Sequence, residues 1–293
     1  MTDLFYSPAY GLAGYSFDTT RKAAWIAESL AQAPIPGIRL CAPAPLDEAA
    51  VAAVHDSAYV TAVRIGRPRS LAESQEFSWD PGLWPMVLAS NGGVVAAAQA
   101  ALQEGVAGSL SSGLHHARYD SGAGYCTFNG LALAARAVLA AGARSVLILD
   151  LDAHCGGGTY TLIRDDPAIW QLDVAVHIFD HYLPRGRGTR DLVGTAAAYL
   201  PTIRARLAAL ADHAFDLCLY NAGMDPHEDC LIGGLPGITD AILAEREQLV
   251  FRWCLRRGLP IAFVPAGGYI GGRLDIPHLV ALHRLTLAAA AAG

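Results

Sequence analysis

The sequence predicts an α/β protein, with a mostly parallel β-sheet flanked by helices on both faces. Two observations support this fold class. Apolar, strand-like runs alternate with helical patterns from end to end, and polar residues follow directly after several of those runs. The 293 residues are 53% apolar and 16% charged, which is a globular composition with enough chain for a substantial core. No repeat or charged linker divides the sequence, so we expect residues 1–293 to form one domain.

The first half of the chain predicts three helices and two strands. TTRKAAWIAESLA has Thr19 or Thr20 as its N-cap, and the other two helical segments show helix-like patterns of apolar residues. GIRLCA and GSLSS are short runs typical of strands. The helices are expected at 19–31, 46–55 and 91–104, and the strands at 37–42 and 108–112.

The second half repeats a regular helix–strand alternation. The Ala-rich segment 129–141 predicts a helix that ends at Gly142, and SVLILD at 145–150 is the clearest strand. The runs DVAVHI, DLCLYN and PIAFVP repeat its apolar pattern. They predict strands at 173–178, 216–221 and 260–265, with helices at 195–211, 238–257 and 276–291.

Polar side chains follow four of the expected strands. These segments are GLHH (113–116), DLDAH (150–154), NAGMD (221–225) and AGGY (266–269). In open parallel sheets, ligands bind at the carboxyl ends of the strands. We therefore expect four strands to deliver His, Asp and Tyr side chains to one edge.

Asp152, His154 and Asp225 are the expected metal ligands. Asp152 and His154 are two residues apart in an extended segment, so both side chains can face one ion. A third ligand from Asp225 would leave an open coordination position, as in catalytic zinc sites. Two carboxylates and one imidazole would also suit Fe(II) or Co(II). The alternative, that Asp152 is a helix cap and His154 a satisfied polar residue, does not account for the other strand ends.

Composition also limits the partners. The net charge is −6 and no basic patch is present, which argues against a nucleic-acid partner. The Ala-rich runs are interrupted too often for a membrane span, and the N-terminus has no signal-peptide pattern. The six cysteines form no C-x-x-C pair, so we expect free thiols and a cytoplasmic protein. Cys155 is expected to be a packing residue, with metal ligation as the alternative.

The chain resembles the histone deacetylase, acetylpolyamine amidohydrolase and acetoin-utilisation protein family. The motifs that carry the resemblance are GLHHARYDSGAGYCTFNG (113–130), DLDAHCGGGT (150–159), NAGMDPHEDCLIGG (221–234) and AGGY (266–269). It implies the arginase-like α/β fold and metal-dependent hydrolysis of an N-acyl amine such as acyl-lysine or an acylpolyamine. No oligomeric state follows from it.

The resemblance assigns roles residue by residue. Asp152, His154 and Asp225 match the zinc ligands, and His115 and His116 match a tandem pair of active-site histidines. Asp150 matches the carboxylate that orients His115, and Tyr269 matches the tyrosine that binds the substrate carbonyl. The metal would activate a water molecule, His116 would take its proton, and Tyr269 with the metal would stabilise the oxyanion.

The resemblance also implies a narrow substrate slot. Gly124 and Tyr125 match one wall, and Leu183 occupies the position of the opposite wall. Leu231 or Ile232 is expected at the rim.

Two positions depart from the family pattern. Gly157 stands where an Asp or Asn normally supports the second histidine, so His116 is expected to lack that carboxylate partner unless another group replaces it. Ala175 stands where a serine normally helps to hold a structural potassium ion, which weakens the expectation of that ion.

Two other functions share these residues. A ureohydrolase of the same fold would bind two manganese ions, but Cys155 and Gly156 follow His154 where that class needs a further aspartate. A catalytically silent ligand-binding protein is the other alternative, and Gly157 is its only support.

Overall fold

The structure, a computed structural model, describes residues 1–14 and 17–292. One eight-stranded sheet runs through it in the order β2-β1-β3-β8-β7-β4-β5-β6, and every neighbouring pair is parallel. The strands are β1 (Thr2–Phe5), β2 (Ile38–Cys41), β3 (Val106–Ser109), β4 (Val146–Asp150), β5 (Ile169–Ala175), β6 (Gly188–Leu192), β7 (Leu217–Gly223) and β8 (Ile261–Ala266).

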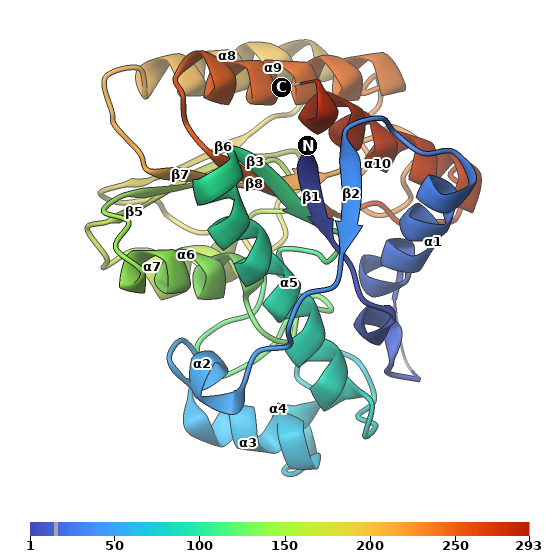
Figure 1. Cartoon of the computed structure of the whole chain (residues 1–293), viewed down its shortest axis with the longest axis vertical. Helices are drawn as coiled ribbons and strands as arrows, with labels where there is room; N and C mark the ends of the chain where they lie inside the picture. The colour runs from blue at the N-terminus through green and yellow to red at the C-terminus, as the bar shows by residue number, and fades with distance from the viewer. Residues whose placement is uncertain (15–16, 293) are drawn as a thin grey trace.

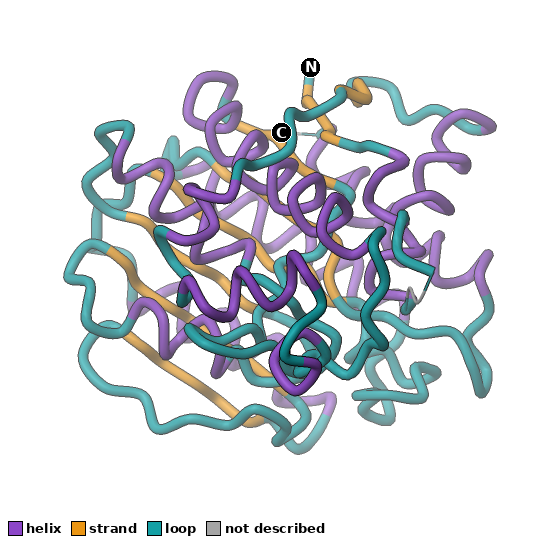
Figure 2. The backbone as a smooth tube through the Cα atoms, turned by 90° about the horizontal axis from the view of Figure 1, so that it is seen from below, coloured by secondary structure: helices purple, strands orange, loops and turns teal. Residues whose placement is uncertain are grey.

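Helices cover both faces of the sheet, as expected. They are η1 (Pro8–Gly11), α1 (Asp18–Gln32), α2 (Glu48–Ala52), α3 (Ser57–Ile65), α4 (Arg69–Ala72), α5 (Leu83–Glu104), α6 (Gly130–Ala140), α7 (Gly157–Ile163), α8 (Ala196–Ala209), α9 (Asp240–Arg256) and α10 (Ile276–Ala291). In Figure 1, α8, α9 and α10 lie above the sheet, and α5, α6 and α7 lie below it. Figure 2 shows the strands side by side between the helices.

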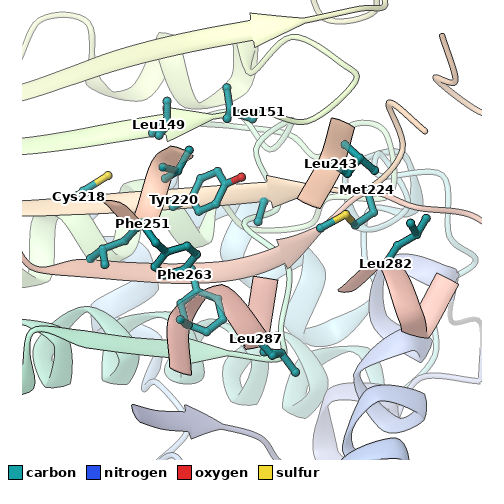
Figure 3. Packing of buried hydrophobic residues seen from close by; sticks show 14 of the residues in the cluster. Leu149, Leu151, Cys218, Tyr220, Met224, Leu243, Phe251, Phe263, Leu282 and Leu287 are labelled. Carbon is teal, nitrogen blue, oxygen red and sulfur yellow. The ribbon is translucent and has the colours of Figure 1, made fainter. Parts of the chain in front are cut away.

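The core forms two large apolar clusters, one on each face of the sheet. Successive residues of β4 alternate between them, with Leu147 and Leu149 in one cluster and Val146 and Ile148 in the other. Figure 3 shows part of the first cluster, with Leu149, Tyr220 and Phe251 among its labelled side chains. Burial on both faces explains why these strands read as continuous apolar runs.

Six elements were missed by the sequence analysis, and two of them, η1 and α4, are helices of only four residues. Strands β1 and β6 are short and carry charged residues, so they show no apolar run. The segment after the predicted helix 46–55 forms a separate helix, α3, capped by the Asp56 carboxylate. Helix α7 begins within the Gly156–Gly158 run, where low helix propensity hides it.

Two element boundaries also differ from the predictions. Helix α5 begins at Leu83 instead of residue 91, because Pro85 lies in its first turn, where proline is tolerated. Strand β5 covers Ile169–Ala175 instead of 173–178, since Ile169 pairs with Val146 at the start of β4 and Ala175 pairs with Leu192 at the end of β6.

Helix α5 is long and apolar enough to cross a membrane by length and composition alone. However, 67% of its most apolar window is buried inside the fold. Its residues Val87, Val94 and Ala98 belong to the core cluster that it shares with α6. The packing against its neighbours therefore accounts for its apolar sequence.

Candidate functional site

The four predicted strand ends meet at one edge of the sheet. Strands β3, β8, β7 and β4 are consecutive neighbours, so the segments that follow them lie together at their carboxyl ends. They bring together all seven residues assigned to catalysis and metal binding, which are His115, His116, Asp150, Asp152, His154, Asp225 and Tyr269. All seven are buried.

Asp152, His154 and Asp225 form a compact group of ligand atoms. His154 Nδ1 lies 3.1 Å from Asp152 Oδ1 and 3.0 Å from Asp225 Oδ2. Each side chain can offer one atom to a single ion, with all three atoms within 4.8 Å of one another. These separations suit the ligands of a tetrahedral zinc ion, which bind at about 2.0–2.2 Å from the metal.

The surroundings of this group also fit a cation. Asp225 Oδ1 accepts a hydrogen bond from the Ala153 amide, whereas the buried Oδ2 has His154 Nδ1 at 3.0 Å but makes no well-formed hydrogen bond among the described residues. Without a bound metal, burial and the neighbouring Asp152 raise the pKa of Asp225 to about 6. Two buried carboxylates this close destabilise each other, and a metal ion would remove that repulsion.

His227, Asp240 and His278 form a second group that fits a metal less well. His227 Nδ1 accepts a hydrogen bond from the Asp229 amide, and its Nε2 lies 2.9 Å from Asp240 Oδ1. The ring proton of a neutral His227 must therefore be on Nε2, which leaves no lone pair there for a metal. His278 Nε2 lies 3.1 Å from the same carboxylate. Asp240 thus joins two histidines by hydrogen bonds.

His115 is held by a carboxylate, as the sequence predicts. Its Nδ1 lies 2.7 Å from Asp150 Oδ2, and Asn221 donates a hydrogen bond of 2.8 Å to the other oxygen, Oδ1. Burial alone would lower the pKa of His115, but Asp150 and Asp152 outweigh it and raise the pKa to about 10. His115 is therefore a cation at neutral pH.

His116 has a carboxylate partner that the sequence analysis did not identify. Its Nδ1 lies 3.0 Å from Asp180 Oδ2, so another group does replace the carboxylate that is missing at Gly157, which is the alternative that the sequence left open. Asp180 lies in the loop after β5 and also pairs with Arg118. Burial and the charge on His115 lower the pKa of His116 to about 4, which keeps the ring neutral at neutral pH.

Tyr269 lines a pocket of about 200 Å³ that reaches the metal group. The other lining residues are Glu76, His116, Gly124, Tyr125, His154, His177, Phe179 and Ile232. Burial, together with Asp225 and Asp152, holds the pKa of Tyr269 well above its usual range. Its hydroxyl thus stays protonated and can donate a hydrogen bond.

The pocket walls correct part of the prediction. Gly124 and Tyr125 line it as expected, but Phe179 stands in place of Leu183 as the apolar wall beside His116. Leu183 is 69% exposed and lines a separate hollow of about 650 Å³. Of the two rim candidates, Ile232 lines the pocket, whereas Leu231 is 71% exposed. The course of the loop between β5 and β6, and not the residue spacing, decides which side chain faces inward.

Lys22, on α1, is a buried residue that the sequence analysis missed. Its Nζ donates a hydrogen bond of 2.5 Å to the Gly267 carbonyl. Burial lowers the pKa of Lys22 to about 8, although the nearby Asp225 and Asp152 act to raise it. Lys22 therefore places positive charge behind the metal group. The only indication of this role in the sequence is that Lys22 lies on the apolar face of the predicted helix 19–31.

Cys155 and Ala175 lie in the apolar cluster that also holds Tyr160 and Tyr182. Cys155 is buried and unpaired, and its Sγ lies 3.6 Å from the His177 carbonyl oxygen. The environment matches the expected packing role. All six cysteines are free, which agrees with the prediction of free thiols.

Comparison with known proteins places these features in a family. Residues 16–275 match the histone deacetylase domain. An uncharacterized protein of Picosynechococcus sp. is 33% identical over 244 residues, covering 79% of each protein. Histone deacetylase 2 of Arabidopsis thaliana is 31% identical over 187 residues, which cover 61% of this chain and 48% of that protein. The matched region thus spans about half the length of the Arabidopsis relative.

A solved structure of acetylpolyamine aminohydrolase from Burkholderia pseudomallei has the same fold. The TM-score is 0.79 at 19% sequence identity, and the match covers 99% of this chain and 98% of the other. The parallel eight-stranded sheet with helices on both faces is therefore the arginase/deacetylase fold, as predicted.

Proposed function

This chain belongs to the histone deacetylase family, and we propose that it is a metal-dependent amidohydrolase that removes a short acyl group, such as acetyl, from an aliphatic amine. The observation that supports this most strongly is one pocket that combines a metal-binding residue with a neutral histidine and a protonated tyrosine. Those residues are His154, His116 and Tyr269. Two ligand carboxylates, Asp152 and Asp225, complete the metal group behind the pocket.

We assign Asp152, His154 and Asp225 as ligands of a zinc ion, with Fe(II) or Co(II) as alternatives that the ligand set also suits. When bound, the metal would polarise the amide carbonyl and lower the pKa of water. His116 accepts the proton of the attacking water, because its ring is neutral and its Nδ1 is already held by Asp180, and it gives this proton to the amine nitrogen as the amide C–N bond breaks. Tyr269 donates a hydrogen bond to the developing oxyanion.

His115 has a different role from His116 in this proposal. Its pKa of about 10 keeps it charged, so it supplies positive charge near the reacting carbonyl instead of accepting a proton. Two neighbouring histidines with pKa values pushed apart are suited to separate tasks. Asp150 orients His115 through the 2.7 Å contact.

The pocket favours an extended aliphatic substrate with a positive charge. Tyr125 and Phe179 provide aromatic walls, and the volume of about 200 Å³ suits a short acyl group with part of an alkyl stem. Glu76 is the acidic residue among the lining groups, and it is exposed. A cationic amine beyond the stem would be attracted to that carboxylate. Acylated polyamines and acyl-lysine peptides share this chemistry.

The structure reduces the support for the two alternatives. Asp180 supplies a carboxylate to His116, so Gly157 no longer argues for a silent binding protein. In the described residues, the second metal-ligand candidate group has its own hydrogen bonds and offers no two-metal site for a ureohydrolase. We also propose that residues 1–293 act as one catalytic domain, because β1 pairs within the same sheet and Thr2 contacts Ala290.

A substrate panel tests the proposed function directly. Zinc-loaded and chelator-treated protein would be assayed on acetyl-lysine peptides, longer acyl-lysines and acetylated polyamines. We expect metal-dependent release of the free acid, with the best rates on cationic substrates. Release that is unaffected by chelation, or none from any substrate by protein with bound zinc, would contradict the proposal.

Zinc uptake should release a proton over a broad pH range. Burial lowers the pKa of His154, but Asp152 and Asp225 outweigh it and raise the pKa to about 10. Asp225 titrates near 6, so between about pH 6 and pH 10 the carboxylates are ionised while His154 carries the proton that zinc must displace. The apparent affinity should rise about tenfold per pH unit in this window.

Calorimetry measures this proton directly. Zinc titrations in buffers of different ionisation enthalpy should give enthalpies that fit release of about one proton at pH 7 to 8. Enthalpies that are equal in all buffers would contradict the assignment of His154 as the ligand.

A further inference from the structure

Asp180 occupies an unusual position beside the pocket. It follows Phe179 in the loop between β5 and β6 and has a left-handed backbone, with φ of 57°. Its side chain is nevertheless only 2% exposed. A non-glycine residue in this conformation with a buried carboxylate is costly unless the surroundings hold it in place.

Three groups hold the Asp180 carboxylate. Oδ2 lies 3.0 Å from His116 Nδ1 and accepts a hydrogen bond of 2.9 Å from the Gly158 amide at the start of α7. Oδ1 accepts a hydrogen bond from the Arg118 guanidinium. With the Arg118 guanidinium and the Gly158 amide both donating to this carboxylate, the oxygen that faces His116 is placed as a hydrogen-bond acceptor.

Gly157 leaves the space that Asp180 fills. A Cβ atom at position 157 would lie 2.2 Å from the Asp180 carbonyl oxygen and 2.6 Å from Oδ1. Both distances are far inside van der Waals contact. A side chain at residue 157 and the observed placement of Asp180 therefore exclude each other.

We propose that Asp180, held by Arg118 and admitted by Gly157, is the positioning residue for His116 in this chain. It replaces, from a different loop, the support that a side chain at position 157 would give. The inference rests on the proposed function for its catalytic consequence. Its structural content, the orientation and proton position of the His116 ring, stands independently of the substrate.

The contact has a clear effect on the His116 ring. An ionised carboxylate at Nδ1 fixes the ring proton there and leaves the lone pair of Nε2 to accept a proton from the reaction. An amide at the same place can donate a hydrogen bond to Nδ1 and thereby favour the opposite tautomer. Replacing Asp180 by asparagine, which has the same shape, therefore separates the effect of the carboxylate charge on His116 from the effect of its position.

The first variant is Asp180→Asn, with Asp191→Asn as its matched control. Asp191 also pairs with an arginine, Arg206, but on β6. We expect Asp180→Asn to lower kcat between about 10- and 100-fold with little change in KM, and Asp191→Asn to leave both unchanged. Zinc content and melting temperature should stay close to those of the parent protein.

Nitrogen NMR of the histidine side chains gives a readout that needs no substrate. In the zinc-loaded protein, the His116 ring should carry its proton on Nδ1, and Asp180→Asn should move it to Nε2. If the parent protein shows this shift but no substrate is turned over, the proposed function fails and the positioning inference survives. An unchanged His116 spectrum in Asp180→Asn would overturn the inference even in an active enzyme.

A mutant cycle tests whether Gly157 acts through Asp180. Gly157→Ala should lower kcat in the parent protein, because the added methyl displaces Asp180, but should have little further effect in Asp180→Asn. The exchange Gly157→Asp with Asp180→Gly should recover activity relative to Asp180→Gly alone. Additive losses in the cycle, together with no recovery in the exchange, would show that the two positions act independently.

Discussion

Replacing Asp225 by alanine is expected to lower the rate of deacylation at least about 1,000-fold, because the metal supplies several kcal/mol of transition-state stabilisation. Asp225 provides one of the three ligand atoms, and its buried Oδ2 makes no well-formed hydrogen bond within the described residues. The variant should also lose the rise in melting temperature that zinc gives the parent protein. Both effects are measured with the same preparations, by assay and by thermal unfolding with and without a chelator.

Asp229→Ala is the matched control for this variant. Asp229 lies four residues further along the same loop and pairs with Arg273 instead of facing the metal group. It should keep both zinc binding and turnover. Equal losses in the two variants would mean that the loop, and not the Asp225 carboxylate, carries the effect.

Asp225→Asn tests the stability of the metal-free protein, which should stay the same or rise in this variant. The amide can still accept the hydrogen bond from Ala153, but the charge beside Asp152 is gone. Since the folded-state pKa of Asp225 is raised to about 6, ionising this group costs stability as the pH rises from about 4 through 6. In chelator at pH 7, Asp225→Asn should therefore unfold at the same or a higher temperature than the parent protein. A lower melting temperature would mean that the two carboxylates do not repel each other.

The parallel sheet and most of the helices that cover it follow from pattern alone. Strands such as β4 are buried on both faces, so the residues of LILD are apolar except for the last. That last residue, Asp150, indicates in the sequence where the strand ends. Strand β6 lies at an edge of the sheet and pairs with β5 alone, and β1, between β2 and β3, is only four residues long, so neither leaves a clear apolar run in the sequence. Pattern therefore predicts the centre of the sheet better than its margins.

The sequence likewise predicts the site residues that follow buried strands better than those that lie on a loop. Residues that follow buried strands, such as Asp152 and Asp225, are fixed by the parallel sheet, and the sequence predicts that they meet. Phe179 and Asp180 lie on a loop, where one left-handed residue decides which side chains turn inward. The periodicity of the sequence carries no information about the backbone turn at Asp180. For that reason the sequence predicts Leu183 in the pocket wall and does not predict the contact of Asp180 with His116. Lys22 was missed because its partners, Gly267 and the metal group, lie far along the chain.

Replacing each of the two adjacent active-site histidines in turn should show which one is the general base. At pH 7 to 8, His116 is neutral, with a pKa lowered to about 4, whereas His115 is charged, with a pKa raised to about 10. Only a neutral ring can accept a proton, so His116→Ala should lower kcat between about 100- and 10,000-fold. The acid limb of the kcat/KM profile that comes from His116 itself should lie near pH 4, because the ring stays neutral above that pH.

His115→Gln and His181→Ala complete this comparison. His181 is exposed and lines the separate hollow, so its removal should leave turnover unchanged. His115→Gln removes a charge without removing the base, and the alkaline limb that His115 gives the parent protein near pH 10 should disappear in this variant. If His115→Gln instead abolished turnover at every pH while His116→Ala kept most of it, the roles of the two rings would have to be reversed. The 2.7 Å contact with Asp150 and the 3.0 Å contact with Asp180 orient both rings through Nδ1, so their different charges, and not their hydrogen-bond patterns, separate the two roles.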